Sequence, residues 1–311
     1  MHKYVLSLLI GGVITNGAFA TGVYENILNV QKACSGISES MHDLKVKAGI
    51  GTAVSAVGAV SGGVALGAGI AKQKTDDEIN RFPDEIYALA RKRVQQDGIN
   101  SLDATKLKSD IDAYIATKQS SGTNSAKTLD QLTEESRKQG DLRTGFVGAA
   151  TATNIASTAL AATNKVGDDL EKNIGDCITA VQDLAKAKFI ATVEQNEEPA
   201  VLSRAETIVT ACRDYEFVDL KPINNRAIGA AVASGIGIGT GVVGTITSAL
   251  ANTDKTRSGN ADAEKNLNTT ANVMSGATAA AGATAVIFNA TQIAAIKKVV
   301  AVADMCEEAL K

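Results

Sequence analysis

The sequence predicts an all-α fold: an elongated helical bundle built from two duplicated antiparallel hairpins that are rich in glycine and alanine. Long uncharged stretches with apolar residues at every third or fourth position predict the helices. A match of the chain to itself predicts the duplication. Four cysteines bracket the two copies and predict that each hairpin is closed by a disulfide.

Residues 1–20 have the pattern of a secretory signal peptide. Lys3 gives a positive start, Tyr4 to Val13 is apolar, and an A-x-A cleavage site ends at Ala20. The apolar run is shorter than the roughly 20 residues that a transmembrane helix needs. We therefore expect cleavage after Ala20 and export to the periplasm or the extracellular space. A retained N-terminal anchor is the alternative.

Composition limits both the core and the partners. The 311 residues include 28 Gly, no Trp and only 4% aromatic residues, so the core must bury small side chains at close backbone approach. The net charge of −3 offers no basic surface, which excludes a typical nucleic-acid-binding protein. In an exported chain, an even number of cysteines is typical of disulfides.

Four long uncharged stretches are predicted to be helices. Helix is favoured over strand because Val54, Val57, Val60 and Val64 are spaced by three and four residues rather than by two. The stretches are Ala48 to Ala71, Thr144 to Asn164, Ala227 to Thr253 and Leu267 to Ile296.

Small residues recur at every fourth position in two of these helices, as in a glycine zipper. Each interior glycine costs about 1 kcal/mol relative to alanine, so we expect close helix packing to offset the cost. The predicted helix-packing residues are Gly51, Ser55, Ala59, Gly63, Gly67 and Ala71 in the first copy, and Gly229, Ala233, Gly237, Gly241, Thr245 and Ala249 in the second.

The repeat and the cysteines together predict the hairpins. When Cys34 is aligned with Cys212, identical residues coincide without a gap, including Gly63-Val64 with Gly241-Val242 and Thr75-Asp76 with Thr253-Asp254. The turn-like segment 254–262 lies midway between Cys212 and Cys306, so a hairpin that turns there brings these two cysteines together. By the same reasoning Cys34 pairs with Cys177.

We expect hairpin one over residues 21–195, a connector over 196–222 and hairpin two over 212–311. Hairpin one differs by a charged helical insertion, residues 77–140, at its far tip. Because loops and insertions on a rigid scaffold often carry binding residues, this insertion is a candidate binding region.

No motif for catalysis, a cofactor or a metal survives comparison with its template. His42 is the one histidine of the mature chain, and we expect it to be an exposed side chain. Asp254, Thr256, Ser258 and Gly259 match the start of an EF-hand loop, but Lys265 stands where the bidentate Glu is needed. Glycines 235, 237, 239 and 241 lack the strand and the Lys-Ser/Thr of a phosphate loop. We expect a non-enzymatic protein without a cofactor or metal.

Two classes of function fit these features. The first is an exported structural or scaffolding protein of the cell envelope that packs on itself through small-residue helix faces, with a homo-oligomer possible. The alternative is a membrane-inserting glycine-zipper hairpin protein, a pore-former or envelope-spanning protein. Against insertion, Asn154, Asn272 and Asn289 would face lipid, and no aromatic belt is present. A binding module that acts through residues 77–140 is a further alternative.

Overall fold

The structure is a computed structural model that describes residues 22–97, 109–110, 113–114, 129–195, 197–253 and 261–311. Within these residues the chain forms helices and no strands, which confirms the predicted all-α fold class. The predicted signal peptide (1–20) and most of the predicted turn (254–262) lie outside the described residues.

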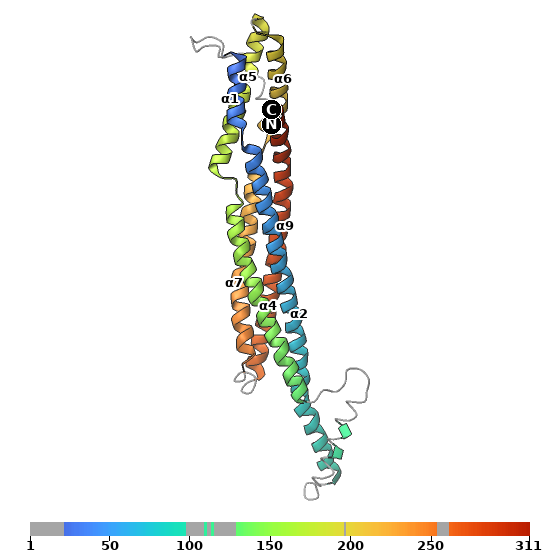
Figure 1. Cartoon of the computed structure of the whole chain (residues 1–311). Helices are drawn as coiled ribbons and strands as arrows, with labels where there is room; N and C mark the ends of the chain where they lie inside the picture. The colour runs from blue at the N-terminus through green and yellow to red at the C-terminus, as the bar shows by residue number, and fades with distance from the viewer. Residues whose placement is uncertain (1–21, 98–108, 111–112, 115–128, 196, 254–260) are drawn as a thin grey trace, which may run out of the picture. The chain divides into compact units, whose positions relative to one another are not determined.

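Seven α-helices and one short 3₁₀ helix make up most of the described chain (Figure 1). They are α1 (Val23–Cys34), α2 (Ile37–Asp97), α4 (Leu129–Thr163), α5 (Asp168–Glu194), α6 (Pro199–Cys212), η2 (Arg213–Phe217), α7 (Lys221–Ala251) and α9 (Ala261–Leu310).

Local sequence explains where several helices begin and end. Gly36 separates α1 from α2 with a φ of +78°, a conformation that glycine adopts without steric cost. Gln195 ends α5 in the left-handed region, and Pro199 occupies the first turn of α6, where no backbone donor is needed. Before α7, the carboxylate of Asp219 accepts a hydrogen bond from the backbone N–H of Lys221 at 3.0 Å.

The chain divides into two compact units. We call residues 1–45, 166–221 and 294–311 the disulfide unit, and residues 46–165 and 222–293 the four-helix unit. The long helices α2 and α9 contribute to both. Each unit therefore combines segments of both predicted hairpins, and the duplication with its boundaries stays a prediction.

The disulfide unit has an apolar core. Helix α1 packs against α5 and α6, and the 3₁₀ helix η2 packs against α5 and α6. Its core contains large aliphatic side chains, among them Val30, Ile37, Leu184, Ile208 and Ile296, each less than 2% exposed.

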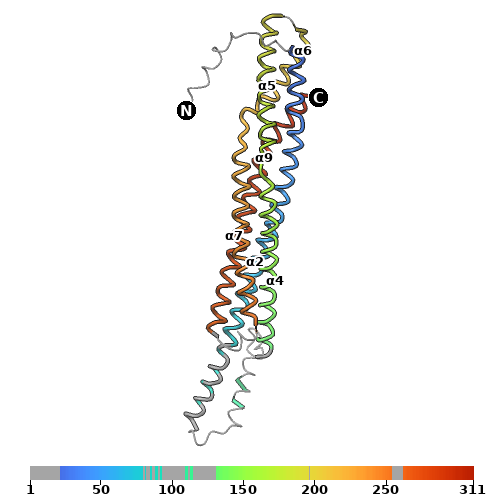
Figure 2. The backbone as a smooth tube through the Cα atoms, turned by 90° about the vertical axis from the view of Figure 1, so that its left-hand side faces the viewer, coloured from blue at the N-terminus to red at the C-terminus, as the bar shows by residue number. Residues whose placement is uncertain are grey.

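The four-helix unit is an antiparallel bundle of α2, α4, α7 and α9, which lie side by side in both views (Figure 2). Helix α4 contacts α2 through Ser157 and Ser55 and contacts α7 through Ser157 and Ser234. Helix α9 contacts α2 through Asn289 and contacts α7 through Thr278 and Thr240.

The buried face of α2 follows a spacing of three and four residues rather than four alone. Its inward residues are Ala48, Gly51, Ser55, Gly58, Gly62, Ala65, Gly69 and Lys72. This is the seven-residue period of a coiled-coil bundle. Because a helix has 3.6 residues per turn, each step of four rotates by about 40° beyond a full turn, and a strict four-residue stripe moves off the buried face.

The predicted small-residue stripe therefore needs correction. Gly51 and Ser55 point inward, and a Cβ on Gly282 would touch Ala59, but Ala71 is only half-buried. Gly63 and Gly67 are exposed, and a Cβ added to either would meet no atom within 4 Å, so their predicted helix contact within the chain is wrong. On α7, the side chains or Cα atoms of Ala233, Gly237 and Gly241 are buried, Gly229 and Thr245 are half-buried, and Ala249 is exposed.

The predicted insertion begins and ends inside continuous helices. Helix α2 passes through Asp77 without a break and reaches Asp97, and α4 begins at Leu129, before Gly140. Residues 98–108, 111–112 and 115–128 lie outside the described residues. Helices α2 and α4 therefore each contain an uncharged stretch and a charged stretch. A helix can continue from one into the other because helix formation does not require an apolar surface on every side.

Candidate functional site

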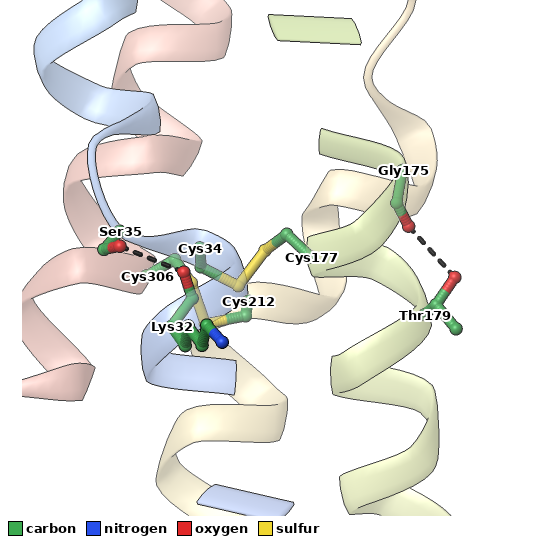
Figure 3. The surroundings of a disulfide bond; sticks show 8 residues. All are labelled: Lys32, Cys34, Ser35, Gly175, Cys177, Thr179, Cys212 and Cys306. Carbon is green, nitrogen blue, oxygen red and sulfur yellow. Dashed lines mark hydrogen bonds between the residues drawn. A yellow bond between two sulfur atoms is a disulfide. The ribbon is translucent and has the colours of Figure 1, made fainter. Parts of the chain in front are cut away.

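Both predicted disulfides are present, and they lie together in the disulfide unit (Figure 3). Cys34 bonds to Cys177, with Cα atoms 4.8 Å apart, and Cys212 bonds to Cys306, with Cα atoms 4.5 Å apart. The sulfur atoms of Cys34, Cys177 and Cys306 lie within 4.8 Å of one another. The sequence did not predict this proximity, since each disulfide was assigned to a separate hairpin. The bonds are consistent with an oxidising compartment.

His42 lies beside Asp304 in the same unit. Its Nε2 is 3.2 Å from Oδ1 of Asp304, and the hydroxyl of Ser38 donates to the same carboxylate oxygen at 2.5 Å. Half of the His42 side chain is exposed. Ser38 hydrogen-bonds to the carboxylate rather than to the imidazole, so the three groups are not arranged as a Ser-His-Asp triad.

Two groups of the disulfide unit have shifted pKa values. The hydrogen bond from Ser38 and the nearby His42 hold the pKa of Asp304 below its ordinary value. Burial raises the pKa of Tyr215 well above its ordinary value, and the carboxylates of Glu307 and Asp304 raise it further. At neutral pH these shifts favour the ionised carboxylate of Asp304 and the neutral hydroxyl of Tyr215.

Polar side chains occupy much of the core of the four-helix unit, together with alanine and glycine. One layer contains Ser55, Ser157, Ser234 and Asn289, one residue from each helix. The hydroxyls of Ser55 and Ser157 are 2.6 Å apart, Ser234 donates to Ser157 at 2.9 Å, and the amide of Asn289 donates to Ser55 at 3.3 Å. These hydrogen bonds tie four helices at one level without any large apolar side chain.

Further amide side chains are buried near this layer. Asn154, Asn164, Asn289 and Gln292 are fully buried. The side chain of Gln292 donates to the backbone carbonyl of Asn164 at 2.7 Å, whereas both side-chain polar atoms of Asn154 have no protein partner. A buried amide without a hydrogen-bond partner is unfavourable, so Asn154 lowers the free energy of unfolding at this position.

A charged layer closes one end of this core. Lys72 is fully buried and lies 2.5 Å from Asp76 and 3.0 Å from Glu264. Arg143 is also fully buried and donates to Ser248, Asn268 and Asn272. Asn268 also donates to Asp76, which joins the two cations to a common hydrogen-bond network. Two cations and two carboxylates make this layer neutral.

The outer surface of the four-helix unit is aliphatic. Eighteen positions carry large apolar side chains that are at least one-third exposed. They are Val46, Ile50, Val57, Val60, Val64 and Ile70 on α2; Leu142, Phe146 and Ile155 on α4; Ile228, Val232, Ile236, Val242, Val243, Ile246 and Leu250 on α7; and Val273 and Ile287 on α9. We call this surface the apolar belt. The disulfide unit also exposes large apolar side chains, among them Phe189, Val193 and Phe217, but its core is built from large aliphatic residues.

The apolar belt coincides with the uncharged stretches. At 1.5 Å per residue, Ala48 to Ala71 spans about 36 Å and Thr144 to Asn164 about 32 Å. By length and composition, three described helical segments can cross a membrane: Val23–Ile79, Lys221–Ala251 and Asp262–Leu310. Helix α4 is not among them, and its inward side carries Arg143 and Asn154.

Comparisons with known proteins give no relative. No family model, no curated protein and no solved structure matches the chain.

Proposed function

We propose that the four-helix unit inserts into a lipid bilayer, with the apolar belt against the acyl chains and the polar core enclosed between the helices. The observation that carries this proposal is the distribution of side chains in the unit: large aliphatic side chains lie outside, and hydroxyl, amide and charged side chains lie inside among alanine and glycine. Soluble monomers rarely expose contiguous apolar patches of more than a few hundred Å², and eighteen large apolar side chains of this unit are at least one-third exposed.

The polar residues that opposed insertion in the sequence now support it. Asn154 and Asn289 are fully buried and Asn272 is 8% exposed, so none of them faces the surroundings of the bundle. Inward amides and hydroxyls that hydrogen-bond between helices are typical of membrane bundles, where the apolar solvent adds no hydrophobic drive to helix association. The objection that asparagine would sit in lipid is therefore removed.

The dimensions and charges of the unit agree with a bilayer. The uncharged stretches are at least as long as the hydrocarbon layer, which is about 30 Å thick. Lys72 and Arg143, the cations at one end of the belt, are turned inward and paired rather than exposed to the surroundings. Charged side chains at the edge of a membrane region are expected to do this.

Flotation and extraction test the proposal. The full chain should float with phosphatidylcholine vesicles on a density gradient and should remain in the pellet after a sodium carbonate wash. Soluble protein after the wash, with an unchanged helical circular dichroism spectrum, would overturn insertion.

Self-packing of an exported scaffold is the second candidate. It is favoured by the exposed glycine pairs Gly63/Gly67 and Gly235/Gly239, none of which has a neighbour within 4 Å of an added Cβ. If copies of the chain cover the apolar belt, the protein should be released by carbonate as an oligomer. Light scattering of the released protein then separates the two candidates.

A further inference from the structure

The two disulfides are close enough to react with each other. All four cysteines belong to the disulfide unit, and the sulfur atoms of Cys34, Cys177 and Cys306 lie within 4.8 Å of one another. Figure 3 shows the two bonds next to each other. The sulfur of Cys212 is not a member of this group, so Cys306 is the sulfur of its bond that is near both atoms of the other bond.

The bond between Cys34 and Cys177 is the easier one to reach from outside. Cys34 is 4% exposed, whereas Cys212 and Cys306 are each 1% exposed. Cys34 is also followed by the exposed residues Ser35 and Gly36, where the chain breaks between α1 and α2. Because reduction of a disulfide by an external thiol depends on access to its sulfur atoms, we expect reduction to begin at Cys34–Cys177.

We propose that the two disulfides form an exchange pair, in which reduction of Cys34–Cys177 by an external dithiol is followed by transfer of the second bond within the chain. In the first step the dithiol is oxidised to its own disulfide, and Cys34 and Cys177 become thiols. In the second step the thiolate of Cys34 or Cys177 attacks the sulfur of Cys306. The new bond to Cys306 forms as the bond to Cys212 breaks, and Cys212 takes up the proton that the attacking thiol has lost.

The second step needs only a small movement. An S–S bond is about 2 Å long, so a sulfur atom that starts within 4.8 Å has to move by no more than about 3 Å. Rotation of one cysteine side chain from one staggered rotamer to another moves its sulfur by about this distance. The exchange therefore does not require the disulfide unit to unfold, and it does not depend on membrane insertion.

The exchange changes which helices are cross-linked. In the structure one bond joins α1 to α5, and the other joins the end of α6 to α9. After exchange, α9 is bonded to α1 or to α5, and α6 has no covalent link to the other helices of the unit apart from the chain itself. A reducing partner of the dithiol class would thereby release α6 although it attacks a different bond.

Partial reduction of the full wild-type chain tests the proposal. The oxidised protein is treated with less than one equivalent of dithiothreitol, quenched with acid and alkylated, and its disulfides are mapped by mass spectrometry. Acid stops the reaction because the thiolate is the nucleophile. We expect Cys34–Cys306 or Cys177–Cys306, together with alkylated Cys212, and the rate of their formation should not change when the protein is diluted. Recovery of Cys34–Cys177 and Cys212–Cys306 alone would overturn the proposal.

Single variants test the route without any reductant. Cys177→Ser leaves the Cys34 thiol beside the second bond, and it should form Cys34–Cys306 and free Cys212. Cys306→Ser is the matched control: it leaves Cys212, whose sulfur lies outside the group of three, so it should retain Cys34–Cys177 and be alkylated at Cys212 alone.

The fold has to be responsible for this difference. In urea both variants should exchange, because the unfolded chain no longer separates Cys212 from the other bond, and circular dichroism should show both variants folded without urea. Equal exchange in the two folded variants would show that the position of Cys306 has no special role and would overturn the proposed route.

Discussion

Gly62 and Gly63 are sequence neighbours with opposite surroundings. A Cβ on Gly62 would lie 2.8 Å from the backbone nitrogen and 2.9 Å from the Cα of Ala279 on α9. A Cβ on Gly63 would meet nothing within 4 Å. The backbone of α2 approaches α9 so closely at Gly62 that only glycine fits there. Gly63 lowers the stability of the helix relative to alanine, and no contact within the chain offsets this loss.

Alanine substitutions at these two positions should shift stability in opposite directions. Gly62→Ala forces α2 and α9 apart and should lower the free energy of unfolding by about 1–3 kcal/mol. Gly63→Ala should raise it by up to about 1 kcal/mol, because alanine is the better helix former. Thermal melts followed by circular dichroism under one condition measure both variants. Destabilisation of the same size at both positions would mean that Gly63 has a contact in the folded protein, as in an oligomer.

Tyr215 should limit the stability of the disulfide unit at alkaline pH. Its pKa is raised by burial first, so its neutral form stabilises the fold fully below the ordinary tyrosine pKa of about 10, and this stability is lost as pH rises through the folded pKa. Tyr215→Phe removes the ionisation and should move alkaline unfolding to higher pH. Tyrosine absorbance and circular dichroism, recorded over the same titration, measure the effect. Coincident unfolding curves for the two proteins would contradict it.

At the scale of elements, the first disulfide joins segments that are far apart in sequence. Cys34 and Cys177 are separated by 143 residues, and they connect α1 to α5. Replacing both by serine frees α1 in the unfolded chain, and it should lower the stability of the disulfide unit by about 2–5 kcal/mol. Thermal melts of the double variant, compared with the oxidised wild type, measure the loss. A melting temperature equal to that of the wild type would show that packing alone holds α1 on α5.

The sequence predicts these elements well where the signal is local or topological. Valine spacing on α2 was enough to choose helix over strand, and the midpoint between Cys212 and Cys306 was enough to predict their pairing. The sequence did not predict which glycines of α2 are buried. Gly51, Gly58, Gly63 and Gly67 have the same size, and only the packing of α2 against α4 and α9, with its seven-residue period, decides which of them points inward.

The limits of the predicted insertion, residues 77–140, do not coincide with helix ends. The change from uncharged to charged sequence after Ala71 marks where the surface of α2 changes, but the backbone remains helical beyond it. The change in composition therefore indicated where the surroundings of the helix change, and not where the helix ends. The same holds for Asn154 and Asn289, whose inward direction follows from register with the other helices and is not visible in one helix alone.

At the scale of the whole molecule, a charge placed on the apolar belt should prevent membrane insertion. Ile236 lies near the middle of the uncharged part of α7 and is 57% exposed. Aspartate at the centre of a membrane helix costs about 2.5–3.5 kcal/mol, so Ile236→Asp should weaken vesicle binding about a hundredfold. Vesicle flotation measures this, and Ile236→Leu is the matched control, with binding like that of the wild type. Unaltered flotation of Ile236→Asp would place α7 outside the lipid.

The continuity of α2 and α9 through both compact units affects how the protein unfolds. Lys45 and Val46 are consecutive residues of α2 but belong to different compact units, and Ile293 and Ala294 do the same on α9. If one unit unfolded alone, α2 and α9 would each have to break at the boundary, and the backbone hydrogen bonds of the helix would be lost there. Heating should therefore produce one cooperative calorimetric transition rather than two, and the backbone amides around Lys45 and Ala294 should exchange with deuterium as slowly as those in either core.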